Sequence, residues 1–161
     1  MSSPTSTSPA PGAGNTSAAY RGCLLAGAVG DALGAPVEFL DEGQIRERFG
    51  AQGIRDFVSD GEQAGVITDD TQMTLFTAEG LMRAFHRAQA RGMCSVDSVV
   101  WHSYKRWWIT QGDSPGKMNR AQDRCDQSWL LDERRLHARR APGRTCLSAL
   151  AGERFEGRAT N

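Results

Sequence analysis

One segment of the sequence carries more polar chemistry than the start of a helix requires. It runs from residue 65 to 74 and places Thr68, Asp69 and Asp70 in succession. One side-chain oxygen would cap a helix here, and each carboxylate in the first turn adds about 0.3–1 kcal/mol of dipole stabilisation. The hydroxyl and the two carboxylates also form an all-oxygen ligand set, which suits Mg²⁺ and is tolerated by Mn²⁺. The pattern alone leaves both an over-capped helix and a metal site open.

A second candidate is Glu38, which follows a proline by two residues and stands between Val37 and Phe39. Partial burial in such apolar surroundings would favour the protonated carboxyl and suit it to proton transfer. An ordinary exposed glutamate in a loop is the alternative that this pattern leaves open. Asp31 lies upstream in a glycine-rich stretch, and we expect a structural role for it.

The elements that must position these residues are all predicted to be helices. Apolar periodicity and capping residues predict helices over 18–33, between Asp41 and Gly50, from Thr68 to about residue 90, and after Ser95. Shorter helices are predicted around 130–136 and after Thr145, which would act as a cap. Because no convincing pair of strands is present, the sequence predicts an all-α fold.

The first predicted helix is unusually rich in small residues. It contains Gly22, Gly27 and Gly30, and a glycine inside a helix costs up to about 1 kcal/mol relative to alanine. Ala26, Gly30 and Gly34 recur every four residues, which places them on one face. This stripe predicts that another element packs closely against the helix.

Length and composition limit the remaining possibilities. The chain has 161 residues, 39% hydrophobic residues and a net charge of zero, so we expect one domain or part of one. Residues 1–17 are rich in Ser, Thr, Pro and Gly and are predicted to be a disordered tail. Residues 18–161 form the predicted folded domain. Residues 1–80 carry four basic and eleven acidic side chains, whereas residues 81–161 carry fifteen and eight, which suggests two complementary parts of one unit.

Several classes of protein are disfavoured by the same reading. The longest apolar stretch is interrupted by charges, which argues against a membrane span, and no secretory signal pattern is present. The four cysteines lack metal or disulfide spacing, so we expect reduced thiols in a cytoplasmic protein. The arginine pairs at 134–135 and 139–140 could contact phosphate, but such runs are usually solvated faces, so we expect no nucleic-acid partner.

Three stretches resemble the ADP-ribosylglycohydrolase family. They are Arg21–Phe39, which reads RGCLLAGAVGDALGAPVEF, then Thr68–Thr74, which reads TDDTQMT, and Ala141–Leu150, which reads APGRTCLSAL. The resemblance covers roughly residues 18–161. Members of this family include the enzyme that removes ADP-ribose from dinitrogenase reductase. The resemblance implies an orthogonal bundle of helices and hydrolysis of the glycosidic bond between ADP-ribose and a modified acceptor.

The resemblance also implies roles for individual residues. Thr68, Asp69 and Asp70 match the family's first ligands for a binuclear Mg²⁺ or Mn²⁺ centre, and Glu38 matches a glutamate near the metals that we assign to acid–base catalysis or gating. The expected partner is an ADP-ribosylated protein or a small molecule that contains ADP-ribose. Substrate-binding residues are left unassigned, and we expect a monomer.

The sequence departs from the family pattern downstream. The family takes its remaining metal ligands from a later DxDT or DxDS segment, and this sequence contains no DxD. We therefore expect an N-terminal portion of such an enzyme with impaired hydrolysis. The alternative is a non-catalytic remnant or binding module that lacks the second half of the metal site.

Overall fold

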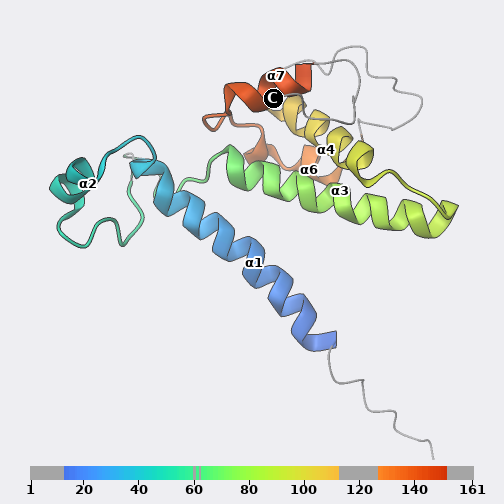
Figure 1. Cartoon of the computed structure of the whole chain (residues 1–161), viewed down its shortest axis with the longest axis horizontal. Coiled ribbons are helices and arrows are strands. Elements are labelled where there is room, and N and C mark those ends of the chain that lie inside the picture. The colour runs from blue at the N-terminus through green and yellow to red at the C-terminus, as the bar shows by residue number, and fades with distance from the viewer. Residues whose placement is uncertain (1–12, 60, 62, 113–126, 152–161) are drawn as a thin grey trace, which may run out of the picture.

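The computed structural model describes residues 13–59, 61, 63–112 and 127–151 (Figure 1). Most of these residues are helical. The elements are α1 (Ala13–Gly34), η1 (Ala35–Val37), α2 (Glu42–Phe49), α3 (Asp69–Arg91), α4 (Val96–Thr110), α6 (Trp129–Asp132), η2 (Arg134–Leu136) and α7 (Arg144–Ala151). Within the described ranges, β pairing is limited to one isolated antiparallel bridge between Ser59 and Ala64. The predicted all-α class is confirmed.

A hairpin of α3 and α4 forms the packed centre of the molecule. Phe76 from α3 and Trp107 from α4 are fully buried against each other's helices. The short elements α6, η2 and α7 cover this pair and complete the core with Leu130, Leu136 and Leu150. In Figure 1 these elements cluster at one side of the chain, while α1 and α2 extend away from them.

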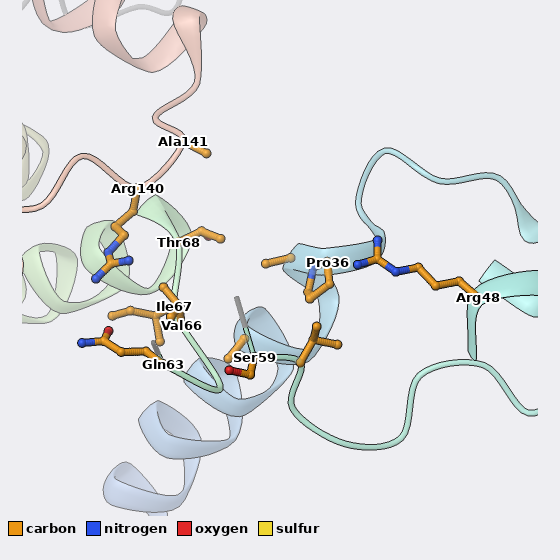
Figure 2. Close-up of a pocket in the computed structure, with 12 residues that line it drawn as sticks. Pro36, Arg48, Ser59, Gln63, Val66, Ile67, Thr68, Arg140 and Ala141 are labelled. Carbon is orange, nitrogen blue, oxygen red and sulfur yellow. The ribbon is translucent and has the colours of Figure 1, made fainter. Parts of the chain in front are cut away.

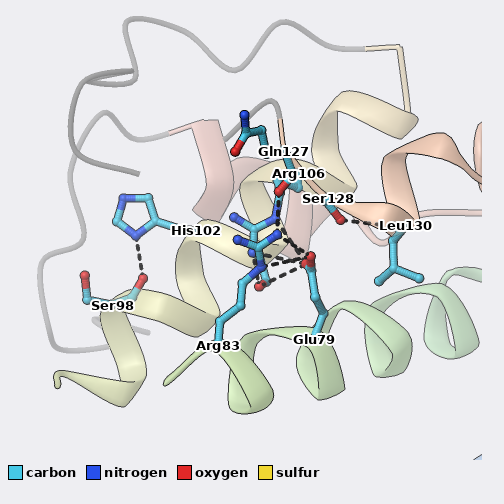
Figure 3. Close-up of polar contacts among 9 residues, drawn as sticks. Glu79, Arg83, Ser98, His102, Arg106, Gln127, Ser128 and Leu130 are labelled. Atoms are coloured by element: carbon cyan, nitrogen blue, oxygen red, sulfur yellow. Dashed lines mark hydrogen bonds and ion pairs between the residues drawn. The ribbon is translucent and has the colours of Figure 1, made fainter. Parts of the chain in front are cut away.

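The same hairpin contains a buried ion pair (Figure 3). Glu79 on α3 and Arg106 on α4 have side chains that are only 1% and 2% exposed, and their charged atoms lie 3.1 Å apart. Arg83, one turn after Glu79, donates from Nε to Oε1 of the same carboxylate at 2.9 Å. Each charge therefore has a hydrogen-bonded partner, which burial of charged groups requires.

Local capping residues set most helix boundaries where the sequence predicts them. The Asp41 side chain and Gln44 form a reciprocal capping box at the start of α2, and Ser95 caps α4. Gly92 ends α3 with a left-handed backbone, φ 73°, that a glycine adopts without strain.

Two predicted boundaries need correction. Helix α1 begins at Ala13, upstream of the predicted start at residue 18. Helix α7 begins at Arg144, and the carbonyl of Gly143 accepts its first hydrogen bond from Leu147, so Thr145 lies inside the helix. Residues 1–12 of the predicted tail lie outside the described residues.

Helix α1 does not show the close packing that its small residues predict. A Cβ atom built on Gly22, Gly27, Gly30 or Gly34 meets no other atom within 4 Å. Leu25 is 67% exposed on the same helix. In the described part of the chain, no element packs closely against these four glycines.

Two further observations concern α1 and the cysteines. No single described helix has the length and apolar composition of a membrane span, although residues 16–37 and 42–49, bent by 98°, meet those limits as a pair. Cys23, Cys94 and Cys146 are free thiols, and Cys125 lies outside the described residues.

Candidate functional site at the start of α3

Thr68 is the residue from which the candidate site is built. It precedes α3 with an extended backbone, and its side-chain oxygen accepts a hydrogen bond from the amide of Asp70 at 3.2 Å. Threonine caps helices in this way because its oxygen satisfies an amide that has no partner within the helix. The cap holds Thr68, Asp69 and Asp70 on one turn, so the three predicted ligands lie together.

Asp31 connects the end of α1 to this turn. Its carboxylate accepts hydrogen bonds from the amide and hydroxyl of Thr68, at 2.8 and 2.6 Å, and from the amide and hydroxyl of Thr71, at 3.3 and 2.5 Å. Burial raises the pKa of the Asp31 carboxyl, but these hydrogen bonds outweigh it and the net pKa lies below its ordinary value of 3.8. Asp31 therefore remains ionised and fixes the orientation of the Thr68 hydroxyl.

Asp69 is held by a turn that precedes α7. Its amide donates to the carbonyl of Arg140 at 2.8 Å, and the amide of Gly143 donates to Asp69 Oδ2 at 3.3 Å. Burial raises the pKa of Asp69, the Gly143 hydrogen bond lowers it, and the charge of Asp70 raises it further, so the net pKa lies above 3.8. A nearby positive charge would favour the ionised form of this carboxylate.

A buried glutamine of α3 fixes the segment between η2 and α7 against this helix. Gln72 is fully buried, and its side-chain nitrogen donates to the carbonyls of Leu136 and Ala138, at 3.3 and 2.9 Å. Its oxygen accepts from the indole of Trp107 and the amide of Gln111, both at 3.1 Å. All the hydrogen-bonding capacity of this amide is thus used to hold three elements together.

The turn that precedes α7 adopts an uncommon backbone conformation. Ala141 has φ 52°, the only positive φ of a non-glycine residue in the described ranges. The left-handed conformation costs an L-residue roughly 1–2 kcal/mol, and the surrounding hydrogen bonds must offset that cost. The conformation aligns the carbonyl of Arg140 and the amide of Gly143 with the same residue, Asp69.

Glu38 takes no part in the hydrogen bonds around Thr68 and Asp69. It lies at the end of η1, and its side chain is exposed, so of the two alternatives that the sequence left open the structure shows the exposed one. The apolar neighbour Phe39 is itself 86% exposed and therefore gives the carboxylate no cover. Across the described residues, no hydrogen bond or ion pair joins Glu38 to the Thr68 turn.

A cavity of about 370 Å³ opens beside Thr68 (Figure 2). Its walls come from the end of α1 with η1, from Arg48 of α2, from residues 58–59, 63 and 66–67, and from the Arg140–Ala141 turn. Figure 2 shows Pro36 and Arg48 on one side of this space and Arg140 and Ala141 on the other. The cavity therefore lies between the elements that position the candidate ligands.

The donor set of the Thr68 turn fits a hard divalent cation. Thr68, Asp69 and Asp70 offer oxygen atoms, and Mg²⁺ and Mn²⁺ prefer oxygen ligands. In the part of the chain that the structure describes, no group of three or more His, Cys, Asp or Glu side chains forms a complete metal site. A cation here would need oxygen ligands beyond these three residues.

Sequence reasoning found the three oxygen donors and expected a structural role for Asp31, which its hydrogen bonds to Thr68 and Thr71 bear out, but it missed Gln72 and Gly143. Gln72 lies in the TDDTQMT stretch, but the sequence alone does not distinguish a buried glutamine from an exposed one. Gly143 lies in a stretch that resembles the family, but its role as a hydrogen-bond donor to Asp69 is seen only in the folded structure.

Comparison with known proteins gives matches over most of the chain. A family model described as ADP-ribosylglycohydrolase matches residues 14–161. An uncharacterised protein of Archaeoglobus fulgidus is 41% identical over 70 residues, which cover 42% of this chain and 22% of the relative. The ADP-ribosyl-[dinitrogen reductase] glycohydrolase of Rhodospirillum rubrum is 43% identical over 63 residues, which cover 37% and 21%. The matches thus span about a fifth of each relative's length. No solved structure matches.

Proposed function

Since the chain belongs to the ADP-ribosylglycohydrolase family, we propose that it contributes the metal-binding turn for hydrolysis of an ADP-ribosyl bond. In this reaction water adds to the anomeric carbon of the ribose, and the bond to the acceptor's nitrogen or oxygen breaks. The acceptor leaves with a proton. The substrate is an ADP-ribosylated protein or a small molecule that contains ADP-ribose.

The observation that carries this proposal is the orientation of the Thr68 hydroxyl. Thr68 Oγ1 gives its single proton to Asp31, at 2.6 Å, and accepts one hydrogen bond from the amide of Asp70. A hydroxyl oxygen has two lone pairs, so one remains for a further ligand. A helix cap alone does not require the hydroxyl proton to be held by a half-buried carboxylate.

The residues of this turn have separate tasks in the proposed reaction. Thr68, Asp69 and Asp70 would hold Mg²⁺ or Mn²⁺, and Gly143 would keep the Asp69 carboxylate in place through its amide. A bound divalent cation supplies Lewis-acid polarisation of a substrate or water oxygen. Glu38, exposed at the end of η1, would exchange a proton with the acceptor or with water.

Metal binding by the isolated chain tests the role of the turn. Isothermal titration with Mn²⁺ should give a measurable affinity, and D69A/D70A should weaken it at least tenfold because two anionic ligands are lost. The matched control is D97A, which removes an exposed acid from the first turn of α4 and should leave the affinity unchanged. Equal Mn²⁺ affinity in D69A/D70A and the wild type would contradict the ligand assignment.

Hydrolysis is tested separately with ADP-ribosyl-arginine and ADP-ribosyl-serine, by release of free ADP-ribose in the presence of Mn²⁺. Binding of ADP-ribose without hydrolysis would favour the alternative function, a non-catalytic binding module. The monomeric state and the cytoplasmic location stay predictions, and sedimentation analysis would test the first.

A further inference from the structure

The hydrogen bonds of Gln72 allow only one orientation of its side-chain amide. The indole nitrogen of Trp107 can only donate, so the atom that faces it at 3.1 Å is the Gln72 oxygen. The carbonyls of Leu136 and Ala138 can only accept, so the atom that faces them at 3.3 and 2.9 Å is the nitrogen. A flipped amide would lose all three hydrogen bonds. Gln72 therefore joins α4 to the segment before α7 in a single arrangement.

The neighbouring amide of Gln111 is held in an unfavourable environment. Gln111 is 5% exposed, and its Nε2 donates to the Gln72 oxygen at 3.1 Å and to Thr110 Oγ1 at 2.9 Å. Its own Oε1 is buried and accepts no hydrogen bond from any described residue. A buried acceptor without a partner is destabilising. Rotation of this amide would place its oxygen against the oxygen of Gln72, so the observed orientation preserves the hydrogen bond to Gln72.

The segment that Gln72 reaches leads directly into the turn that holds Asp69. The carbonyl of Arg140 accepts the Asp69 amide at 2.8 Å, and the amide of Gly143 donates to Asp69 Oδ2 at 3.3 Å. Between them Ala141 has a left-handed backbone, φ 52°, which is unfavourable for an L-residue. Such a conformation persists only where surrounding contacts enforce it. The hydrogen bonds from Gln72 anchor the chain immediately before this turn.

We propose that Gln72 is a positioning residue for the Asp69 carboxylate and acts through residues 136–143. The use of this carboxylate as a metal ligand rests on the proposed function, whereas its position does not. Loss of a hydrogen-bond partner of a metal ligand typically weakens metal binding by about 10–100-fold. Because Gln72 acts through an intervening segment, its removal should weaken Mn²⁺ binding by about tenfold, the lower end of this range.

The variant Q72M tests the proposal, because methionine keeps the length of the side chain and removes its hydrogen bonds. The variant and the wild-type chain are compared at a temperature where circular dichroism shows both to be fully folded. Without metal, hydrogen exchange at the Asp69 amide should accelerate by about tenfold, the effect of about one lost hydrogen bond. In a calorimetric titration, the Mn²⁺ affinity should fall by about tenfold. Unchanged exchange at Asp69 would overturn the proposal.

The two measurements separate this proposal from the proposed function. Accelerated exchange in Q72M together with a normal Mn²⁺ affinity in D69A/D70A would support the positioning of Asp69 and contradict its role as a metal ligand. If D69A/D70A loses affinity but Q72M binds Mn²⁺ as tightly as the wild type, Gln72 has only a structural role and the proposal is overturned.

Two further variants serve as controls. Q89M makes the same substitution at an exposed position of α3 and should change neither the exchange at Asp69 nor the Mn²⁺ affinity. Q111A removes one donor to the Gln72 oxygen but leaves both hydrogen bonds from Gln72 to residues 136 and 138, so each effect should stay below about threefold. Equal effects of Q111A and Q72M would indicate a general loosening of the core and overturn the proposal.

The substitution A141G provides a rescue experiment. Glycine adopts a positive φ without the penalty that Ala141 carries, so A141G should reduce the dependence of the turn on Gln72. The double variant Q72M/A141G should therefore exchange more slowly at the Asp69 amide than Q72M does. A structural role of Gln72 elsewhere in the core would not respond to this substitution, so an absence of rescue would overturn the proposal.

A measurement on the wild-type chain covers the case in which Q72M does not fold. In native-state exchange at low urea concentrations, the Gln72 Nε2 protons and the Asp69 amide should exchange together and with the same dependence on urea, because one cooperative unit holds both. Exchange at Asp69 while the Gln72 Nε2 protons remain protected would overturn the proposal.

Discussion

Helices α1 and α3 have nearly the same length, 22 and 23 residues, but they are stabilised in different ways. Helix α3 buries Phe76 and Glu79 against α4, and it meets its partner so closely at Gly80 that a Cβ there would lie 2.9 Å from the backbone of Val100. Helix α1 leaves its glycines open, and its Asp31 side chain binds the start of α3. The comparison teaches that a glycine in a helix indicates close packing only where a neighbouring element is present.

The largest expected effect comes from breaking the buried ion pair of the hairpin. E79A leaves Arg106 buried without its carboxylate, which should lower the free energy of unfolding by about 3–5 kcal/mol. Urea denaturation followed by tryptophan fluorescence, to which the buried Trp107 contributes, measures this loss. E42A, which breaks the exposed pair with Arg46, is the control and should change stability by less than about 1 kcal/mol. If E79A and E42A lowered the free energy of unfolding by similar amounts, the contrast between the buried ion pair of the hairpin and the exposed ion pair of α2 would be contradicted.

Alanine substitutions at two glycines compare the helices directly. G80A forces a Cβ against Val100 and Ser103 and should destabilise the chain by about 1–3 kcal/mol. G27A meets nothing within 4 Å and should leave stability unchanged or raise it by up to about 1 kcal/mol. Thermal unfolding monitored by circular dichroism gives both values. Destabilisation by G27A would indicate that α1 is packed in solution.

Removing the contact between the two regions should have an intermediate effect. D31A deletes the acceptor of hydrogen bonds from Thr68 and Thr71 and should cost about 1–2 kcal/mol. Hydrogen exchange at the Thr68 and Thr71 amides should accelerate, while exchange in the middle of α4 should change less. T71V, which removes one hydroxyl donor to Asp31, is the milder variant. Unchanged exchange at Thr68 in D31A would show that Asp31 does not hold the turn.

An exposed ion pair provides the smallest effect and a contrast with the buried one. Hydrogen bonds from Arg135 lower the pKa of Glu133 from 4.5 to about 2. A lowered folded-state pKa stabilises the chain above pH 4.5, and this stabilisation is lost as the pH falls through about 2. A ¹³C NMR titration of the Glu133 carboxyl should find the lowered midpoint, and R135A should return it towards 4.5. The same midpoint in both proteins would contradict this cause.

Local signals account for what the sequence predicted well. The capping box of Asp41 and Gln44, the cap at Thr68 and the glycine stop at residue 92 each depend on residues within a few positions of one another. Such patterns are read directly from the chain. They predicted the all-α class and placed Thr68, Asp69 and Asp70 on one turn.

The remaining features depend on partners that are distant in sequence. The hydrogen bonds of Gln72 to Leu136 and Ala138 and the hydrogen bond from Gly143 to Asp69 join the start of α3 to a segment 64 to 74 residues further along the chain. No period or spacing indicates which helix covers a given side chain. For the same reason the sequence left the exposure of Glu38 open, and the open glycine stripe of α1 differed from expectation.

The hydrogen bonds around Asp69 also constrain the order of events during synthesis. Gly143 is 74 residues from Asp69, and Asp31 is 37 residues from Thr68. Translation adds about 5–20 residues per second. Gly143 therefore emerges from the ribosome several seconds after the start of α3. During that interval the nascent chain can form the Thr68 cap and its contact with Asp31, but the Asp69 carboxylate stays untethered. The turn that carries the candidate ligands is therefore assembled in two stages, and the second stage requires residue 143.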